Sequence, residues 1–356
     1  MSSTLIAVGE DAAAADCDRL WSPAKEKATN RAAVYGGRSP LLHRRFRLLV
    51  GGKRARLLFS LCAVGFLVIF SSRIGPFMGW NTHYPSSVYS PSRGGYTVLI
   101  NTWKQNSVLK QSVAHYASCS GTDAIHVVWS ESDPPSDSLK AFLKKIVRVK
   151  SQTARKPNFK FDLNEEDDLN NRFKSIKDLR TDAIFSVDDD VIVPCDTLDF
   201  AFATWQSAPD TMVGFVPRMH WLAQEKSSTA NYKYGGWWSV WWTGSYSMVL
   251  TKAAFFHRTY LDLYTHEMPS SIHEYISRER NCEDIAMSLL VANSTDAPPI
   301  WVKGKIHDIG SSGISDLRGH SNTRNKCLND LISLYGMMPL VSTNAKAVDA
   351  RSGWFW

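Results

Sequence analysis

The chain has 356 residues, 44% hydrophobic and 21% charged, a composition typical of a globular protein with ample material for a core. Its 41 Lys and Arg residues outnumber its 34 Asp and Glu residues. Residues 1–56 hold 11 of the basic and 5 of the acidic residues, so the remainder is nearly neutral, with 30 against 29. The excess of positive charge therefore belongs to an N-terminal segment, and the main domain is not expected to bind nucleic acid.

An apolar stretch, Ala55–Ser72, follows the basic segment and carries no charge after Arg56. As a helix, its 18 residues would be about 27 Å long, enough to cross the core of a bilayer. Basic residues crowd its N-terminal side, whereas only Arg73 lies just after it, so the positive-inside rule predicts a cytosolic N-terminus. A cleaved signal peptide is disfavoured because the apolar run begins so late, and a buried core helix is the other alternative.

These features predict four segments. Residues 1–54 form a disordered cytosolic tail, 55–74 a signal anchor, 75–95 a lumenal stem, and 96–356 a folded lumenal domain. Disulfides are possible in a lumen, where four of the six cysteines would lie. Asn293-Ser-Thr is the one N-glycosylation sequon in the sequence, and it falls on the lumenal side.

Strands and helices alternate from Tyr96 onward, which predicts an α/β domain with a largely parallel sheet. The expected strands are Tyr96–Asn101, Ala124–Trp129 and Ala183–Val193, and the expected helices begin near Ser107 and Ser136. Ligands bind beyond the carboxyl ends of the strands in such sheets. Asn101, Trp129 and the acidic triplet Asp188–Asp190 all fall at these ends.

The triplet lies in FSVDDDVIVP, where three carboxylates interrupt a run of apolar, β-branched residues. On an extended chain Asp188 and Asp190 point the same way, roughly 7 Å apart, and repel by about 2 kcal/mol. A divalent cation shared with an anionic ligand would make this arrangement favourable, and hard carboxylate oxygens suit Mn²⁺ or Mg²⁺. The alternative is an acidic loop or a cap for the helix expected after Cys195.

Ordered segments from Tyr96 to the C-terminus resemble the exostosin-like glycosyltransferases, glycosyltransferase family 64. These segments are LINTW (Leu99–Trp103), IHVVW (Ile125–Trp129), Asn171-Arg172, VDDD (Val187–Asp190), VGFVPR (Val213–Arg218), YSMV (Tyr246–Val249), NCEDIAM (Asn281–Met287), RNKCLN (Arg324–Asn329) and GMMPL (Gly336–Leu340). The resemblance implies a nucleotide-diphospho-sugar (GT-A) fold, a metal ion and retention of anomeric configuration. The segments are most similar to the short plant branch of the family. That resemblance implies transfer of mannose from GDP-mannose to the headgroup of glycosyl inositol phosphorylceramide sphingolipids in the Golgi.

The resemblance also implies roles for individual residues at the donor site. Asp190 would bind the metal, with Asp188 beside it. The expected contacts of the nucleotide sugar are Asn101, Gln105, Ser130, Asp167, Arg172, Asp188 and Asp189. Gln105 and Ser130 depart from the residues usual in the family, so they leave the nucleotide open between GDP and UDP.

Asp284 and Arg324 are the catalytic residues that the resemblance implies, Asp284 near the sugar and Arg324 near the leaving diphosphate. From the sequence alone, Glu283 and Asp284 could simply favour the N-terminus of a helix. The resemblance further implies a Cys282–Cys327 disulfide, which would tie the two catalytic segments together. Cys119 and Cys195 are expected to remain free, buried thiols.

Two motifs keep open alternatives. The run YGGWWSVWWTG (Tyr234–Gly244) would either contact an acceptor sugar or lipid headgroups, or form a hairpin with half its tryptophans in the core. His307 is either an extra metal ligand or an ordinary loop histidine. For function, the alternatives to a GDP-mannose-dependent transferase are a UDP-N-acetylhexosamine transferase and a non-catalytic lumenal scaffold.

Overall fold

The computed structural model describes residues 57–66, 94–151, 157–223, 231–310 and 320–350. The chain divides into two units, residues 1–84 and 85–356. In the first unit, residues 57–66 form a helix that leaves Leu57, Phe59 and Phe66 exposed. Among the described residues, no helix is both long and apolar enough to cross a bilayer. The cytosolic tail, half of the anchor and most of the stem lie outside the described residues, so these predictions stay predictions.

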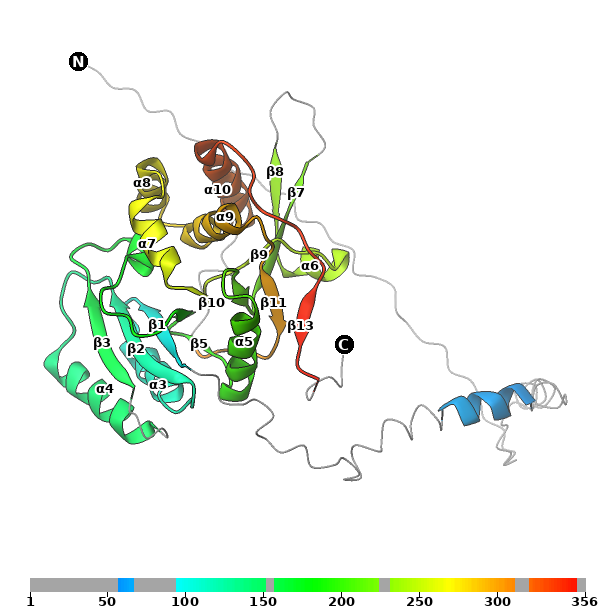
Figure 1. The fold of residues 1–356 in the computed structure, drawn as a ribbon, viewed down its shortest axis with the longest axis horizontal. Coiled ribbons are helices and arrows are strands. Elements are labelled where there is room, and N and C mark those ends of the chain that lie inside the picture. Colours follow the sequence, from blue (N-terminus) through cyan, green and yellow to red (C-terminus); the bar gives the residue numbers. More distant parts are fainter. Residues whose placement is uncertain (1–56, 67–93, 152–156, 224–230, 311–319, 351–356) are drawn as a thin grey trace, which may run out of the picture. The chain divides into compact units, whose positions relative to one another are not determined.

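The second unit is built on an eight-stranded sheet in the order β13-β11-β6-β10-β4-β1-β2-β3 (Figure 1). Of its seven strand pairs, the two that involve β10 are antiparallel and the others parallel, which confirms the predicted α/β class. The strands are β1 (Tyr96–Thr102), β2 (Thr122–Trp129), β3 (Asn158–Leu163), β4 (Ala183–Asp188), β6 (Val213–Gly214), β10 (Ala253–His257), β11 (Ile300–Lys303) and β13 (Lys346–Val348).

Helices cover both faces of this sheet, which explains why its strands are apolar on both sides. Side chains alternate along β1, so that Val98 and Ile100 join one core cluster and Leu99 joins the other. The first cluster includes residues of α3 (Asn106–Tyr116), α4 (Asp137–Lys150) and α5 (Cys195–Ser207). The second includes residues of α7 (Thr259–His266), α8 (Ser270–Glu279), α9 (Glu283–Thr295) and α10 (His320–Tyr335).

The three central strands β4, β1 and β2 end together. Asn101 lies opposite Asp188 on one side and Val128 on the other, and Thr102 lies opposite Trp129. This register brings the predicted strand ends to one edge of the sheet. The prediction of a single strand over Ala183–Val193 is wrong, because the chain turns at Asp189 and Asp190. Val191–Ile192 then form β5, which pairs with β12 (His307–Asp308) in a separate small sheet.

A three-stranded antiparallel sheet, in the order β8-β7-β9, carries the tryptophan run. Its strands are β7 (Pro217–Leu222), β8 (Tyr232–Gly235) and β9 (Met248–Val249). Trp237–Thr243 form the short helix α6 beside β7, and Val240 is its buried residue (Figure 1). All four tryptophans of this helix are exposed. The alternative of a hairpin with half its tryptophans in the core is therefore wrong.

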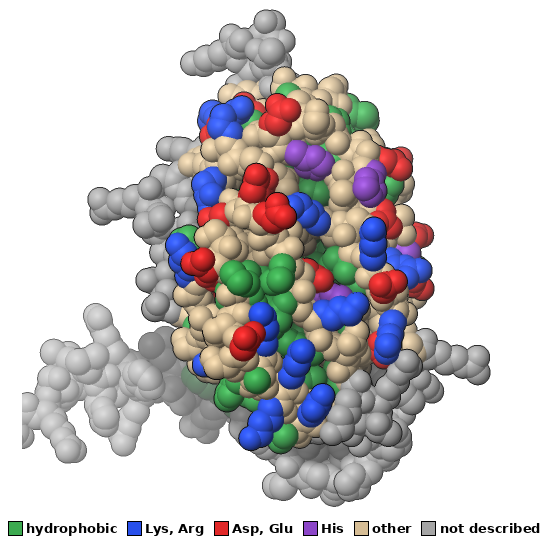
Figure 2. Space-filling view, turned by 90° about the vertical axis from the view of Figure 1, so that its left-hand side faces the viewer, with side chains coloured by type: hydrophobic (Ala, Val, Ile, Leu, Met, Phe, Trp, Pro, Cys, Tyr) green, Lys and Arg blue, Asp and Glu red, His purple; other side chains and the backbone are tan. Residues whose placement is uncertain are grey.

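Charged side chains of both signs occur on the face shown in Figure 2, where Lys and Arg lie among Asp and Glu over most of the surface. This distribution agrees with the near balance of charge in the sequence after residue 56.

All three sheets, both core clusters and both disulfides lie within residues 96–348. Residues 85–356 thus contain everything that holds this unit together.

Two disulfides close the unit. Cys282 and Cys327 are bonded, as the resemblance implied. Cys119 and Cys195 are also bonded, so the expectation of two free thiols is wrong. Cys119 follows α3 and Cys195 begins α5, and both helices pack on the same face of the sheet. The Cα atoms of the two cysteines are therefore only 5.2 Å apart. That separation suits a disulfide. Sequence spacing could not show it, because 76 positions separate the two cysteines.

Replacing both Cys119 and Cys195 by Ser should lower the free energy of unfolding by about 4 kcal/mol, because the bond closes a long loop in the unfolded chain. Urea denaturation of residues 85–356 measures the difference. Reductant should lower the stability of the wild type further than that of this variant, which keeps only Cys282–Cys327. Equal stability of the variant and the oxidised wild type would contradict the bond.

Candidate active site

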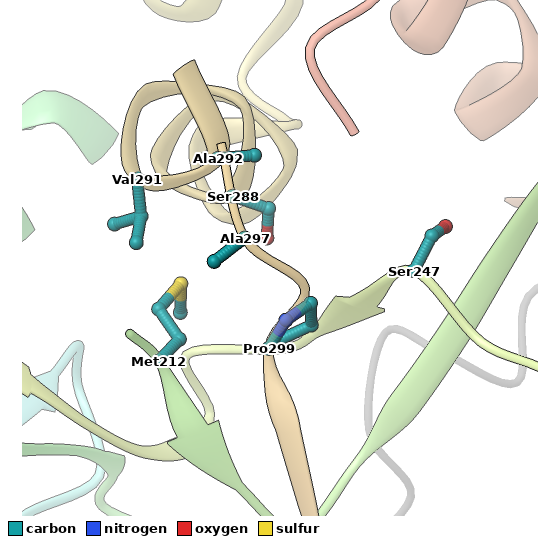
Figure 3. A pocket seen from close by; sticks show the side chains of 7 residues that line it. All are labelled: Met212, Ser247, Ser288, Val291, Ala292, Ala297 and Pro299. Atoms are coloured by element: carbon teal, nitrogen blue, oxygen red, sulfur yellow. The ribbon is translucent and has the colours of Figure 1, made fainter. Parts of the chain in front are cut away.

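The small cavity in Figure 3 is not the site. It is lined by Met212, Ser247, Ser288, Val291, Ala292, Ala297 and Pro299, and none of these side chains is charged. It has room for about one water molecule. A sugar nucleotide needs a much larger space and groups that neutralise phosphate. The residues with that chemistry lie instead at the carboxyl edge of the central sheet.

Asp189 is anchored to β1 and lies buried. Its backbone N–H donates to the carbonyl oxygen of Asn101 at 3.1 Å, and its carboxylate accepts a hydrogen bond of 2.6 Å from the Thr102 hydroxyl. Burial raises the pKa of the Asp189 carboxyl to about 7, against the effect of the Thr102 bond, and the neighbouring carboxylates act in the same direction as burial. Asp189 therefore fixes the turn after β4 and carries only part of a negative charge near neutral pH.

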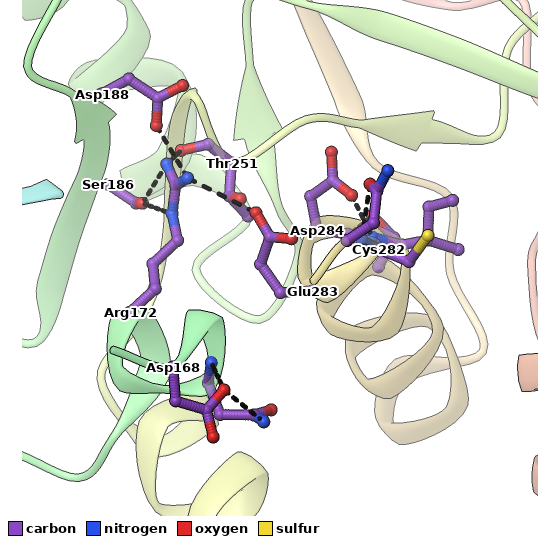
Figure 4. Close-up of polar contacts among 12 residues, drawn as sticks. Asp168, Arg172, Ser186, Asp188, Thr251, Cys282, Glu283 and Asp284 are labelled. Atoms are coloured by element: carbon purple, nitrogen blue, oxygen red, sulfur yellow. Dashed lines mark hydrogen bonds and ion pairs between the residues drawn. The ribbon is translucent and has the colours of Figure 1, made fainter. Parts of the chain in front are cut away.

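Arg172 places a positive charge beside the carboxylates of Asp188 and Glu283. It lies on the short 3₁₀ helix Leu169–Phe173, and its side chain is only 5% exposed. One guanidinium nitrogen lies 2.7 Å from Asp188 Oδ1, an ion pair without the alignment of a hydrogen bond, and 3.8 Å from Glu283 (Figure 4). The other nitrogens donate to the Ser186 hydroxyl and to the carbonyl oxygen of Thr251. Arg172 thus contacts protein groups on all sides, and its contact with a nucleotide stays a prediction.

Asp190 is the member of the triplet that lies beside β12, the strand that contains Asp308. The backbone N–H of Ile309 donates to its carbonyl oxygen at 2.7 Å, which places β12 and Asp308 alongside it. A Cβ atom on Gly310 would come within 2.8 Å of the Asp190 side chain, so a glycine is required there. Burial raises the pKa of Asp190, and Asp188 and Asp308 act in the same direction, against the effect of Lys252.

This arrangement fits a divalent cation that is held only partly by protein. Mg²⁺ and Mn²⁺ sites commonly use one or two carboxylates and complete their coordination with water and substrate phosphates. Asp190, with Asp188 beside it, offers such hard oxygen ligands. Among the described residues, the one group of three ligand atoms that converge within 4.8 Å is His115, Cys119 and Cys195, and its two sulfurs are used in the disulfide.

Asp284 and Arg324 form a second, buried ion pair near the first turn of α9. Asp284 also accepts a hydrogen bond from the backbone N–H of Ile285. Burial would raise the pKa of Asp284, but Arg324 holds it below its ordinary value, so this carboxylate stays ionised. The Nε atom of Arg324 is buried and has no hydrogen-bond partner in the described part of the chain.

Glu283 lies between the two arginines and is 12% exposed. Burial and the neighbouring Asp284 raise the pKa of Glu283 to about 7, although Arg172 and Arg324 oppose them. Figure 4 shows Glu283 pointing toward Arg172 while Asp284 points away from it. Two acids and two arginines from three distant segments thus meet here. A favourable effect of both acids on the helix N-terminus is therefore not enough to explain them.

The backbone at the start of α9 is held in a rare conformation. Cys282 has φ of 78°, a left-handed value that is uncommon for any residue with a side chain. The side chain of Asn281 accepts a hydrogen bond from the Cys282 N–H, and the disulfide to Cys327 fixes the same residue to α10. Since Arg324 lies one turn before Cys327, this bond holds the two charged partners together, as the resemblance implied.

The remaining predicted donor contacts lie around the same edge. Ser130 is buried and accepts a hydrogen bond from Asn171. Asp167 pairs with Arg280 at 2.8 Å and accepts a hydrogen bond from the Trp103 indole. Gln105 is exposed just before α3, and its side chain makes no capping bond there.

Three contributors were missed from the sequence: Thr102, Arg280 and Asp308. Arg280 and Asp308 lie in no motif, and Thr102 lies in LINTW without a role assigned to it there. Strand pairing or loop packing brings each of them to the site. His307 is exposed in β12, and Asn293 is exposed near the end of α9. Roles for these two as metal ligand and glycosylation site stay predictions.

The carboxyl-edge acids, the buried arginines and the α/β fold are those of an enzyme that handles phosphorylated sugars. The model of the glycosyl transferase family 64 domain matches residues 96–354, so the chain belongs to this family and is a glycosyltransferase.

Two relatives illustrate the range of this family. The chain is 60% identical to glycosylinositol phosphorylceramide mannosyl transferase 1 of Arabidopsis thaliana over 267 residues, which cover 75% of this chain and 80% of the relative. It is 33% identical to human exostosin-2 over 258 residues, 70% of this chain but only 33% of that much longer protein.

A solved structure of mannosyltransferase PcManGT from Pyrobaculum calidifontis, in complex with GDP-Man and Mn²⁺, is similar with a TM-score of 0.42 and 13% identity. The match covers 78% of this chain and 74% of that one. A score this low supports no conclusion about the site.

Replacing Arg172 by Met should cost about 3–5 kcal/mol of unfolding free energy, because Asp188 and Glu283 would keep buried charges without their cation. Urea denaturation measures this. Arg258→Met is the matched control, since Arg258 pairs with the exposed Asp182 at the surface and should cost about 1 kcal/mol or less. Similar losses in the two variants would refute the balancing role of Arg172.

Replacing Glu283 by Gln should change how stability depends on pH. The pKa of Glu283 is raised in the folded state, so its contribution is present below about pH 4.5 and is lost as the pH rises toward 7. The melting temperature of Glu283→Gln should therefore improve relative to wild type between pH 4.5 and pH 8. Thermal melts at both values measure this, and a constant difference would show that Glu283 titrates normally.

Proposed function

We propose that this glycosyltransferase transfers mannose from GDP-mannose to the glycan headgroup of glycosylinositol phosphorylceramide. The observation that carries this proposal is the 60% identity over 267 residues, 75% of this chain, to the Arabidopsis thaliana mannosyl transferase of that name. The longer exostosin-2 relatives are about half as similar, which favours the mannose donor over a UDP-linked sugar. The domain would have the GT-A fold, and its largely parallel sheet supports this.

The donor would lie along the carboxyl ends of β4, β1 and β2. Asn101, Ser130 and Asp167 surround the space for the nucleoside, and Asp189 would receive the sugar or ribose hydroxyls. Asp190, together with Asp188, would hold Mn²⁺ or Mg²⁺, which neutralises the diphosphate when bound. The crowding of Asp190 with Asp188 and Asp308 supports this assignment, because a cation would relieve it.

Asp284 and Arg324 would act at the sugar itself. The ionised Asp284 stabilises positive charge that develops on the ring carbon in an oxocarbenium-like transition state. Arg324, with its unpaired Nε donor, offsets the negative charge on the departing diphosphate. Because retention of configuration requires the acceptor to enter from the face that the diphosphate leaves, the diphosphate can take the acceptor's proton.

The enzyme would be a single-pass type II protein of the Golgi membrane. The basic segment before Ala55–Ser72 and its apolar sequence support an anchor with a cytosolic N-terminus. The two disulfides of the folded unit suit an oxidising lumen. The acceptor is a membrane lipid, so the anchor would keep the enzyme at its substrate.

Asp190→Asn should reduce mannose transfer at least about a hundredfold, because the loss of one metal ligand removes charge stabilisation worth several kcal/mol. Its melting temperature should stay close to that of wild type, since Asp190 lies crowded among acids rather than paired. Transfer from radiolabelled GDP-mannose to extracted glycolipid measures activity. Asp182→Asn, at the exposed start of β4, is the control and should keep full activity.

The same assay compares donors and metals. GDP-mannose with Mn²⁺ should support transfer, whereas chelator should abolish it and UDP-N-acetylglucosamine should not replace GDP-mannose. Transfer from the UDP sugar alone would overturn the mannose assignment. Full activity of Asp190→Asn in chelator would overturn the metal site.

A further inference from the structure

The tryptophan surface is the largest exposed aromatic feature among the described residues of the folded unit. We define it as Trp221, Trp237, Trp238, Trp241 and Trp242. Within α6, Trp242 is 82% exposed, Trp238 is 76% and Trp241 is 62%. Exposed indoles at this density are rare, because burying one indole recovers several kcal/mol from water. A surface of this kind marks a contact with something else.

The indoles of this surface lie against one another rather than in a core. The rings of Trp238 and Trp241 meet edge to face at 6.1 Å, and those of Trp241 and Trp242 lie 6.4 Å apart. The ring of Trp221 lies against Gly235 and beside Ser239 of α6, so the surface continues onto β7. Trp238, Trp241 and Trp242 thus form an apolar area on α6, and Trp221 adds a further exposed indole on β7.

Among the described residues, the charged side chains close to this surface are basic, whereas Glu225 lies outside the described residues. The described residues from Pro217 to Val249 contain no Asp or Glu but include Arg218 and Lys233, and Lys233 lies opposite Trp221 in the β7–β8 pair. Lys346 lies over the ring of Trp301, and that ring meets Trp237 at 5.7 Å. Aromatic side chains with basic neighbours match a bilayer interface whose headgroups carry phosphate, as the proposed phosphorylceramide acceptor does.

The length of the chain makes such a surface reachable. Twenty-seven residues lie between Phe66 and Gly94, and fully extended they would span at most about 90 Å. With Ala55–Ser72 as a membrane anchor, as proposed above, every copy of the folded unit stays within that distance of the bilayer. A lipid surface is then the partner that the tryptophan surface meets most often.

The tryptophan surface is also coupled to the catalytic pair. The backbone N–H groups of Tyr232 and Tyr234 in β8 donate to Asn329 and Asn325 of α10, the helix that carries Arg324. α6 follows β8 directly, so its position is tied to the position of α10.

We propose that the tryptophan surface inserts into the interfacial layer of an anionic membrane and so presents the site to acceptors embedded there. Indoles are suited to this layer because their ring is apolar and their N–H can bond to headgroups or water. The proposal rests on the proposed function for its acceptor. The binding itself can be tested without any transfer reaction.

Residues 85–356, without the anchor, should be floated with vesicles of phosphatidylcholine and phosphatidylserine. Wild type should float with the vesicles, and its tryptophan fluorescence should shift to shorter wavelength. Trp238→Ser/Trp242→Ser should lower the partition coefficient about tenfold or more and keep its melting temperature, since both side chains are exposed. Phe142→Ser/Val149→Ser, two exposed apolar residues of α4, should bind like wild type.

A second measurement uses the full chain with two forms of acceptor. Trp238→Ser/Trp242→Ser should raise the KM for glycolipid in vesicles but leave the KM for the detached, soluble headgroup glycan unchanged. An equal loss with both acceptors would show that these tryptophans contact the sugar, and it would overturn the membrane proposal.

Three other results would also overturn it. The first is a wild type that does not float, and the second is a double tryptophan variant that floats as well as wild type. The third is that wild type does not bind vesicles and sediments as a dimer, whereas the double variant sediments as a monomer. That result would make the surface a contact between copies of the chain. Failure of mannose transfer would leave flotation unaffected, so the two proposals can be rejected separately.

Discussion

Two buried arginines determine how so many carboxylates coexist at one end of the sheet. Arg172 lies against Asp188 and approaches Glu283, and Arg324 pairs with Asp284. Without these cations, each acid would either lose its charge or oppose folding. With them, Asp284 stays ionised, whereas the remaining crowding falls on Asp190. Asp189 and Glu283 share this crowding, since their pKa values are raised as well, and a cation bound beside Asp190 would relieve part of it.

The positions of the central strands could be predicted because each is a short apolar run that ends in a polar residue. Tyr96–Asn101 and Ala124–Trp129 agree with β1 and β2 to within two residues at each end. The interruption after Asp188 was not predicted, because Val191–Ile192 is as apolar as the strand before it. Its pairing with β12 depends on a segment more than a hundred residues later, and no local pattern encodes that contact.

The site shows the same division. Asp188–Asp190, Asp284 and Arg324 lie in motifs that a family resemblance can reveal, and the structure brings the first group beside Arg172 and pairs the other two. Asp308 and Thr102 reach the site only through the register of strands. The Cys119–Cys195 bond was missed because each cysteine looks like an ordinary buried residue. In α6, Gly236 and the left-handed Gly244 bound a single short helix, a signal that the dense tryptophans obscured.

The bond between Cys282 and Cys327 has a consequence for when this protein matures. Asp284 lies two residues after Cys282, whose strained conformation the bond helps to hold, and Arg324 lies on the segment at the other end of the bond. In a reducing cytosol the chain would have to bring these two charges together by packing alone. With the Golgi location proposed above, oxidation after export would lock them in place and so complete the proposed catalytic pair.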